Sequence, residues 1–131
     1  TIATGQLGRL ARTIYSMPPD HGAVIVDRVL SQPALRQSWS EELAAMAARI
    51  NELRRLLADA LSAQLPGSSF AWITHQRGMF SRLDLAPAMV EALRDVHHVY
   101  VAPDGRMNIA GISASNVEHV ARSVASVMGS R

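Results

Sequence analysis

Arginine is the residue type in this 131-residue chain with the most specific chemistry to offer. All 13 basic side chains are arginine, and the chain contains neither lysine nor cysteine. A guanidinium group presents a planar fork of N–H donors that suits a bidentate contact with a carboxylate. Without lysine the chain supplies no amine for a Schiff base, and without cysteine it supplies no thiol nucleophile, disulfide or thiolate metal site.

Arg106 is the arginine whose place in the sequence most favours a binding role. It follows Pro103, Asp104 and Gly105, which are residue types typical of a tight turn, and it precedes a short apolar segment predicted to be a strand. A guanidinium at that place would be held on a rigid element and could bind an anionic group. The same spacing also fits an ordinary surface arginine beside a turn, so spacing alone leaves both interpretations open.

Other catalytic and binding motifs are not indicated. The histidine pair His97 and His98 points in different directions on either a helix or a strand, so we expect no metal site. The glycines form no phosphate-binding loop, and no glycine-flanked serine indicates a hydrolase. The arginines are spread along the chain, and Arg54-Arg55 is typical of a solvated helix face, so no nucleic-acid partner is expected.

The composition is that of an ordinary globular chain, with 48% hydrophobic and 18% charged residues. The apolar runs fall short of the roughly 18 residues that a membrane span needs, so no membrane partner is expected. The first residues lack the layout of a signal peptide. The lack of cysteine is compatible with a reducing compartment, and we expect a cytoplasmic location.

Helical periodicity dominates the first half of the chain. It predicts one helix from Thr4 to Tyr15, ended by Pro18-Pro19, and a second from His21 to Leu30. A longer helix is predicted over residues 33–65, where apolar residues recur in steps of three and four: Leu35, Trp39, Leu43, Met46, Ile50, Leu53, Leu57 and Leu61. At about 1.5 Å per residue this helix would be roughly 45 Å long. One compact domain of this size would not cover it, so it should bridge two bodies or pack against a partner.

The second half has a mixed pattern after Pro66-Gly67. Short strands are predicted around residues 70–73, 79–81, 99–101 and 107–109. Helices are predicted from Asp84 or Leu85 to Val96, and from Ser113 or Ser115 to Met128. The expected fold class is α/β, as a small α+β domain in which the long helix is followed by the order β-β-α-β-β-α.

Three ordered motifs resemble one known family. They are residues 12–19 (RTIYSMPP), 76–81 (QRGMFS) and 105–111 (GRMNIAG). Together they resemble the C-terminal region of the aspartate and aromatic amino acid aminotransferases, fold-type-I enzymes that use pyridoxal phosphate. The resemblance extends over essentially the whole chain in order, and it implies the fold of the C-terminal domain of a pyridoxal-phosphate-dependent transferase.

The resemblance implies a role for particular residues of this sequence. Arg106 matches the arginine that binds the substrate α-carboxylate. Arg12 matches the arginine that reaches the neighbouring subunit's active site and meets the side-chain carboxylate of dicarboxylic substrates. Phe80 matches an aromatic residue that lines the site where the small domain closes, and Tyr15 and Ser16 would lie near the site.

The resemblance also implies a domain organisation and partners. Residues 1–32 would be the tail of a large cofactor domain and a dimer-facing segment, residues 33–65 a connecting helix, and residues 66–131 the small C-terminal domain. The implied partners are a missing N-terminal large domain, a second subunit in a homodimer, and amino acid and 2-oxo acid substrates.

The missing lysine decides what this chain can do by itself. In the family, a lysine upstream of the matched region forms the Schiff base with pyridoxal phosphate. Because this chain has no lysine, we expect it to bind no cofactor covalently and to be inactive alone. The family's other cofactor-binding residues also lie upstream of the matched region, so the resemblance implies no catalytic and no cofactor-binding residue in this chain. It would be part of an aminotransferase that moves an amino group from an aromatic or dicarboxylic amino acid to a 2-oxo acid. The alternative is a non-catalytic helical interaction or dimerisation module, which the heptad-like stripe also fits.

Overall fold

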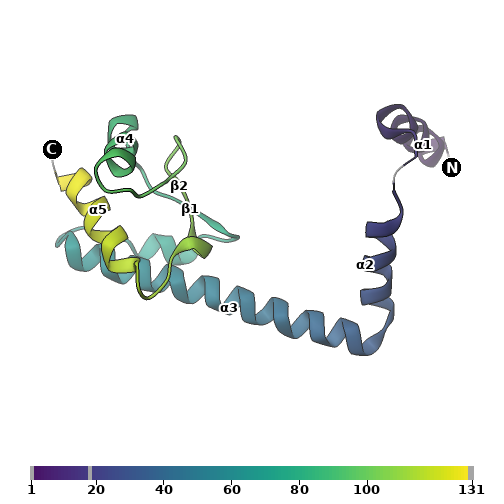
Figure 1. Ribbon diagram of the computed structural model, residues 1–131, viewed down its shortest axis with the longest axis horizontal. Helices are drawn as coiled ribbons and strands as arrows, with labels where there is room; N and C mark the ends of the chain where they lie inside the picture. Colours follow the sequence, from purple (N-terminus) through teal and green to yellow (C-terminus); the bar gives the residue numbers. More distant parts are fainter. Residues whose placement is uncertain (1, 18, 130–131) are drawn as a thin grey trace. The chain divides into compact units, whose positions relative to one another are not determined.

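The computed structural model describes residues 2–17 and 19–129. Contacts divide the chain into two compact units, Thr1–Leu43 and Ala44–Arg131. The elements, labelled in Figure 1, are α1 (Ile2–Tyr15), α2 (His21–Ser31), α3 (Pro33–Gln64), η1 (Ala71–His75), β1 (Phe80–Arg82), α4 (Pro87–Asp95), β2 (Arg106–Asn108), η2 (Ile109–Gly111) and α5 (Val117–Gly129). The boundary between the units falls inside α3, so each unit is described separately.

The first unit consists of amphipathic helices that bury no side chain. Neither α1 nor α2 has a buried residue. Leu10 and Ile14 of α1 are 60% and 76% exposed, although they lie on one apolar face. The helix ends where Ser16, in the left-handed region with φ 57°, donates its N–H to the carbonyl oxygen of Arg12 at 3.0 Å. Both predicted helices are confirmed, and Pro18 of the predicted connector lies outside the described residues.

The long helix is confirmed, and only its later part is buried. Its buried residues are Leu53, Arg54, Leu57, Ala58, Ala60 and Leu61. Earlier on the same predicted stripe, Trp39, Leu43 and Met46 remain 46%, 46% and 52% exposed. The expectation that a compact domain would not cover the whole helix is therefore confirmed.

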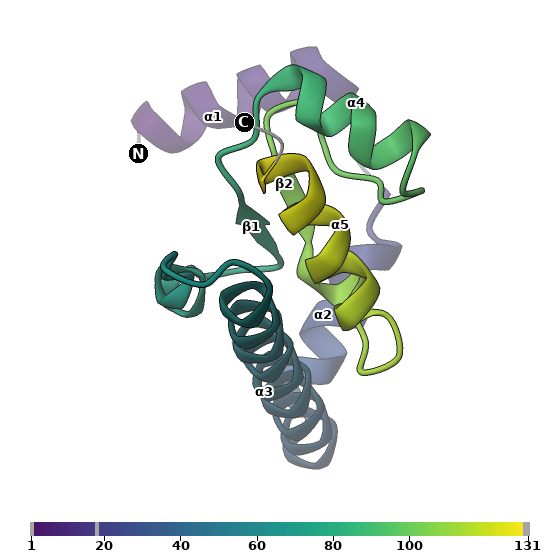
Figure 2. The same ribbon diagram turned by 90° about the vertical axis from the view of Figure 1, so that its left-hand side faces the viewer.

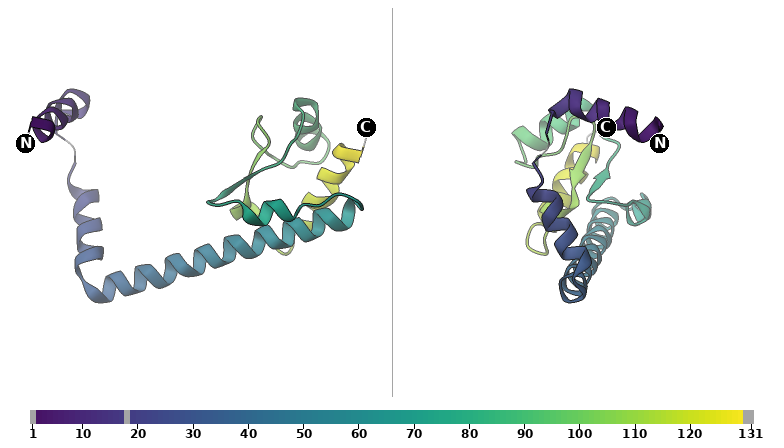
Figure 3. Two further views of the ribbon diagram at one scale, coloured as in Figure 1. Left: turned by 180° about the vertical axis from the view of Figure 1, so that it is seen from behind. Right: turned by 90° about the vertical axis from the view of Figure 1, so that its right-hand side faces the viewer.

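The core of the second unit forms where α3 meets the elements that follow it. Fully buried side chains come from α3, η1, α4, η2 and α5, among them Leu57, Leu61, Ile73, Leu93, Ile109 and Val124. Figure 2, which looks along α3, shows α5 beside the β1–β2 ribbon, and Figure 3 shows from behind that the segment after α3 turns back along it. Burial of one leucine stabilises a fold by about 1.5–3 kcal/mol, so this cluster is what holds the second unit together.

One small antiparallel sheet is present in the described residues. β1 pairs with β2 in the register Phe80 opposite Asn108, Ser81 opposite Met107 and Arg82 opposite Arg106. The strand predictions near residues 79–81 and 107–109 and the α+β class are confirmed. The helices begin slightly later than predicted, α4 at Pro87 and α5 at Val117.

The strand predicted at residues 70–73 is wrong. This segment forms the 3-10 helix η1, in which Ile73 donates its N–H to Phe70 at 3.0 Å and Gln76 donates to Ile73 at 3.2 Å. Phe70 and Ile73, three residues apart, are therefore buried on the same side. A short apolar run fits a three-residue period as well as the two-residue period of a strand.

The strand predicted at residues 99–101 is also wrong. The N–H of Val99 donates to the carbonyl oxygen of Leu93 at 2.9 Å, and the N–H of Ala102 donates to that of Arg106 at 2.8 Å. These bonds close local turns and do not form a strand ladder. The order after α3 is accordingly 3-10 helix, strand, helix, strand, 3-10 helix, helix, in place of β-β-α-β-β-α. In the described part of the chain no helix combines the length and the apolar character needed to cross a bilayer.

Candidate functional site

The exposed face of the β1–β2 ladder brings two of the predicted site residues together. Side chains alternate between the faces of a strand, and both strands have the burial pattern exposed, buried, exposed. Phe80, Arg82, Arg106 and Asn108 therefore share the outer face, which we call the arginine face. Arg106 is diagonal to Phe80 across the ladder, a separation of about 7–8 Å that long side chains can span.

Arg106 is held at one edge of its guanidinium by Asp104. Its Nε donates to Oδ2 of Asp104 at 2.7 Å, and its backbone N–H donates to Oδ1 at 3.2 Å. The two terminal nitrogens make no hydrogen bond or ion pair within the described residues, and the side chain is 58% exposed. Asp104 thus orients the arginine and leaves the Nη pair open to a second carboxylate in end-on, bidentate geometry.

Asp104 remains charged through its contacts with Arg106. Desolvation raises the pKa of Asp104, but the hydrogen bonds from the backbone and side chain of Arg106, together with its charge, lower it more, and the net shift is downward. The backbone oxygen of Asp104 also accepts from Nε of Arg82 at 3.0 Å. Arg82 and Arg106 lie directly opposite each other, where like charges repel, and among the described residues the carboxylate of Asp104 pairs with Arg106 alone. The excess positive charge favours binding of an anion on this face.

Gly105 sets the backbone from which Arg106 projects. Its φ is +80°, and a Cβ there would lie well inside contact distance of the carbonyl oxygen of Leu83 and 3.4 Å from its carbonyl carbon. Two backbone hydrogen bonds hold this close approach. The N–H of Leu83 donates to the carbonyl oxygen of Gly105 at 3.0 Å, and the N–H of Gly105 donates to that of Ala102 at 2.9 Å. Only glycine fits this conformation and this space.

Phe80, the other predicted site residue on the arginine face, is 48% exposed. The remaining predicted site residues lie elsewhere in the chain. Arg12, Tyr15 and Ser16 lie together at the C-terminal end of α1, in the first unit, and all three are exposed. The first unit is described by itself, so the roles of these three residues near the site remain predictions.

Arg54 is a buried residue that sequence reasoning assigned wrongly to a solvated helix face. The prediction holds for Arg55, which is exposed and pairs with Glu52 and Asp59, but Arg54 is 1% exposed. The available signal was its place on α3, four residues after Ile50 and three before Leu57, which widens the buried stripe. Its contacts are with the segment that leads into β1.

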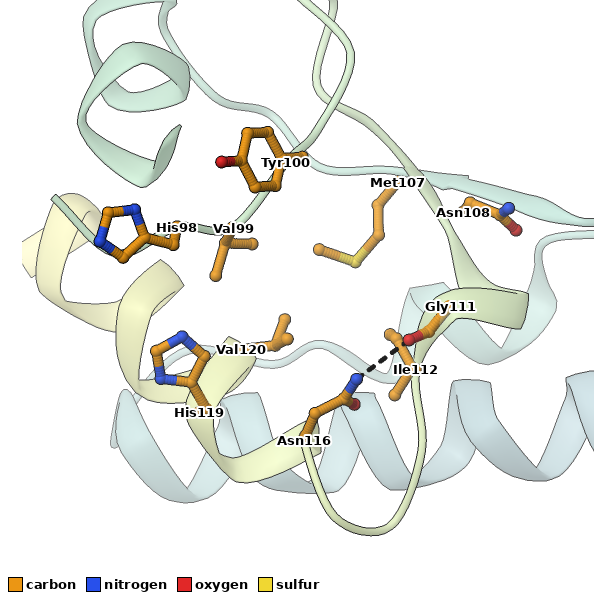
Figure 4. Close-up of a pocket in the computed structure, with 10 residues that line it drawn as sticks. All are labelled: His98, Val99, Tyr100, Met107, Asn108, Gly111, Ile112, Asn116, His119 and Val120. Carbon is orange, nitrogen blue, oxygen red and sulfur yellow. Dashed lines mark hydrogen bonds between the residues drawn. The ribbon is translucent and has the colours of Figure 1, made fainter. Parts of the chain in front are cut away.

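A pocket of about 300 Å³ lies on the opposite side of β2 from the arginine face. Figure 4 shows Met107 pointing into it and Asn108 pointing away. His98 and His119 are among its lining residues, but no arginine is. The described residues contain no group of three or more metal-ligand side chains. The pocket therefore offers no guanidinium group to a phosphate or carboxylate ligand.

Comparison with known proteins assigns the chain to a family. Residues 3–124 match the profile described as aminotransferase class I and II. The chain is 43% identical over 124 residues to the tyrosine aminotransferase of Klebsiella pneumoniae, covering 95% of this chain and 31% of that protein. It is 38% identical over 125 residues to the cytoplasmic aspartate aminotransferase of Saccharomyces cerevisiae, covering 95% of this chain and 30% of that protein.

Solved structures show the same likeness in three dimensions. The fold superposes with a TM-score of 0.87 on the aromatic-amino-acid aminotransferase of Burkholderia pseudomallei covalently bound to pyridoxal phosphate, at 41% identity over 94% of this chain and 31% of that one. The TM-score is 0.89 for the Saccharomyces cerevisiae cytoplasmic aspartate aminotransferase, at 37% identity over 98% of this chain and 31% of that one. The chain thus spans about 30% of the length of the relatives it matches.

Proposed function

The chain belongs to the aminotransferase class I and II family, and we propose that it is the C-terminal part of a longer aminotransferase and supplies the arginine that binds the substrate α-carboxylate. The observation that carries this proposal is the geometry of Arg106. Its Nε is bonded to Asp104, and its two terminal nitrogens have no partner among the described residues. A substrate carboxylate has the chemistry to complete that arrangement.

The residues of this chain do not fit pyridoxal phosphate itself. There is no lysine in the sequence, and no arginine lines the pocket behind β2 to bind a phosphate group. We therefore place the cofactor site in the part of the protein outside these 131 residues and assign no chemical step to this chain. The chain's contribution is to bind and orient the substrate and to exclude water when its domain closes.

The proposed organisation follows the long helix. Residues 1–32 are the tail of the cofactor domain and face a second subunit, residues 33–65 connect, and residues 66–131 form the small domain. The exposed apolar faces of α1, α2 and the first part of α3 support this proposal, because exposed apolar surface of that extent marks an interface. The enzyme would work as a homodimer in the cytoplasm.

The proposed substrates are an aromatic or dicarboxylic amino acid and a 2-oxo acid. The relatives are named for tyrosine, aromatic amino acids and aspartate, and every such substrate carries an α-carboxylate. A charge-assisted hydrogen bond to that group is worth about 1.5–3 kcal/mol. Arg106 would bind the α-carboxylate of all of these substrates. Arg12 would bind only the side-chain carboxylate of the dicarboxylic ones and so distinguish them from the aromatic ones.

The role of Arg12 is tested by changing it to alanine in the full-length protein. We expect kcat/KM for aspartate and glutamate to fall by about tenfold or more, because a charge-assisted contact with the side-chain carboxylate is lost. For phenylalanine and tyrosine we expect a change of less than about threefold, since they have no second carboxylate. Steady-state kinetics with a common 2-oxo acid gives the four values.

Arg9→Ala is the matched control. Arg9 is an exposed arginine on the same helix, three residues before Arg12, and its recorded contact is made by its backbone oxygen, which accepts from Thr13. This variant should leave all four specificity constants unchanged. Equal losses for dicarboxylic and aromatic substrates in Arg12→Ala would remove the proposed distal role.

A further inference from the structure

The free edge of β1 is covered by side chains. In the ladder with β2, Met79 accepts a bond from the N–H of Ile109 at 3.0 Å and Leu83 donates to Gly105 at 3.0 Å. Because antiparallel strands direct alternate residues toward the partner, the backbone polar groups of Phe80 and Arg82 point away from β2. These outward groups need other partners if the strand is to stay fixed.

Two side chains provide partners for three of these four groups, the N–H and carbonyl of Arg82 and the carbonyl of Phe80. Gln76 accepts from the N–H of Arg82 at 3.1 Å and donates to its carbonyl oxygen at 3.5 Å. Arg54 donates from Nη2 to the carbonyl oxygen of Phe80 at 3.3 Å and also to that of Gly78. Its Nε donates to the hydroxyl oxygen of Ser81 at 3.3 Å, and Ser81 is 2% exposed. A single guanidinium therefore holds three of the four residues from Gly78 to Ser81.

The hydrogen bonds from Arg54 to Gly78, Phe80 and Ser81, which we call the Arg54 clamp, include no carboxylate acceptor. The remaining hydrogen bond of Arg54 is to the amide oxygen of Asn51 at 3.3 Å, so all of its acceptors among the described residues are neutral. Burial and then the charge of Arg77 lower the pKa of Arg54 below its ordinary value, although a guanidinium keeps its charge at neutral pH. A buried cation is tolerated only when hydrogen bonds replace its hydration, so the position of Arg54 and that of residues 78–81 depend on each other.

We propose that Arg54 is a positioning residue for carboxylate binding, which fixes β1 from the side opposite β2 and so holds Phe80 and the partner strand of Arg106 in register. This inference rests on the proposed function of Arg106. The guanidinium does not touch the substrate, because it is buried beneath the strand whose outer side chains form the arginine face.

The test compares Arg54→Met and Arg54→Lys with Arg55→Met in the full-length enzyme. A small displacement of a binding group costs up to about a hundredfold, so we expect Arg54→Met to raise KM for both amino acid and 2-oxo acid by about 10- to 100-fold, with kcat changed less than about threefold. Arg54→Lys, which keeps the charge but not the fork, should give an intermediate KM. Arg55→Met removes only exposed ion pairs and should leave KM unchanged.

The split between KM and kcat separates positioning from simple loss of fold. A variant that is partly unfolded loses active enzyme, so its apparent kcat falls while KM stays as in the parent. That result for both Arg54 variants would overturn the inference. If neither variant can be purified folded, Ser81→Ala takes their place, since it removes one acceptor of the clamp. It should raise KM by about fivefold, the effect of one hydrogen bond, and an unchanged KM would overturn the inference.

Parallel measurement of Arg106→Leu keeps the two proposals apart. A raised KM in Arg54→Met, with a double variant whose loss is smaller than the product of the single losses, supports action through Arg106. A strong effect of Arg106→Leu with no effect of Arg54→Met overturns the inference and leaves the proposed function intact. No effect of Arg106→Leu overturns the proposed function and, with it, the inference.

Discussion

Replacing Arg106 with leucine in the full-length enzyme is expected to lower kcat/KM for every amino acid substrate by roughly 10- to 150-fold. The range follows from the loss of a charge-assisted carboxylate contact worth about 1.5–3 kcal/mol, at about 1.4 kcal/mol for each factor of ten. The loss should be similar for aromatic and dicarboxylic substrates, because all of them carry the α-carboxylate that Arg106 is proposed to bind. Steady-state kinetics with one substrate of each class measures it.

The matched control for this variant is Arg94→Leu. Arg94 is an exposed arginine on α4 that pairs with its neighbour Asp95, and it is not on the arginine face. Its replacement removes the same charge and similar bulk, and should change kcat/KM less than about twofold, since an exposed ion pair contributes little. If Arg106→Leu behaves like Arg94→Leu, Arg106 is not the carboxylate-binding residue.

Gly105→Ala is expected to lower the free energy of unfolding of the full-length protein by about 2–6 kcal/mol. A non-glycine residue with a positive φ costs about 1–3 kcal/mol, and forcing a methyl group against the backbone of Leu83 adds about 1–3 kcal/mol. The strain falls between Asp104 and Arg106, so the affinity for carboxylate ligands should fall as well. Urea unfolding and titration with a substrate-like dicarboxylate measure the two effects.

Gly67→Ala separates conformational strain from steric overlap. Gly67 also has a positive φ, +93°, but a Cβ there meets no atom within 4 Å. Gly67→Ala should lower the free energy of unfolding only by the cost of the positive φ, about 1–3 kcal/mol, and should leave ligand affinity unchanged. If Gly105→Ala is no more destabilising than Gly67→Ala, the backbone contact with Leu83 does not constrain the turn.

The sequence predicted the helices well because their signals are long and periodic. The stripe from Leu35 to Leu61 repeats often enough to define α3, and prolines mark the helix boundaries before and after α2. Strands of three residues carry no such repetition. Residues 70–73 fit the three-residue period of a 3-10 helix as well as the two-residue period of a strand. Residues 99–101 lack a neighbouring strand to pair with, and no local sequence pattern reveals this.

The arginine face could be predicted only in part. The turn at residues 103–105 and the strand after it indicated that Arg106 would be held rigidly, and the register of β1 with β2 places Phe80 on the same face. The buried state of Arg54 depends on residues 78–81, more than twenty positions away, and on carbonyl groups that every residue type possesses. A charge beside an apolar stripe is more often solvated, so its role became visible only in three dimensions.

The most direct test of carboxylate binding by Arg106 is a crystal structure of the full-length enzyme with a bound dicarboxylic substrate analogue. We expect the α-carboxylate to lie end-on to Arg106, with its two oxygens about 2.7–2.9 Å from the two Nη nitrogens, while Nε keeps its bond to Asp104. A fully occupied analogue whose α-carboxylate is bound by another residue, with Arg106 directed to solvent, would contradict it.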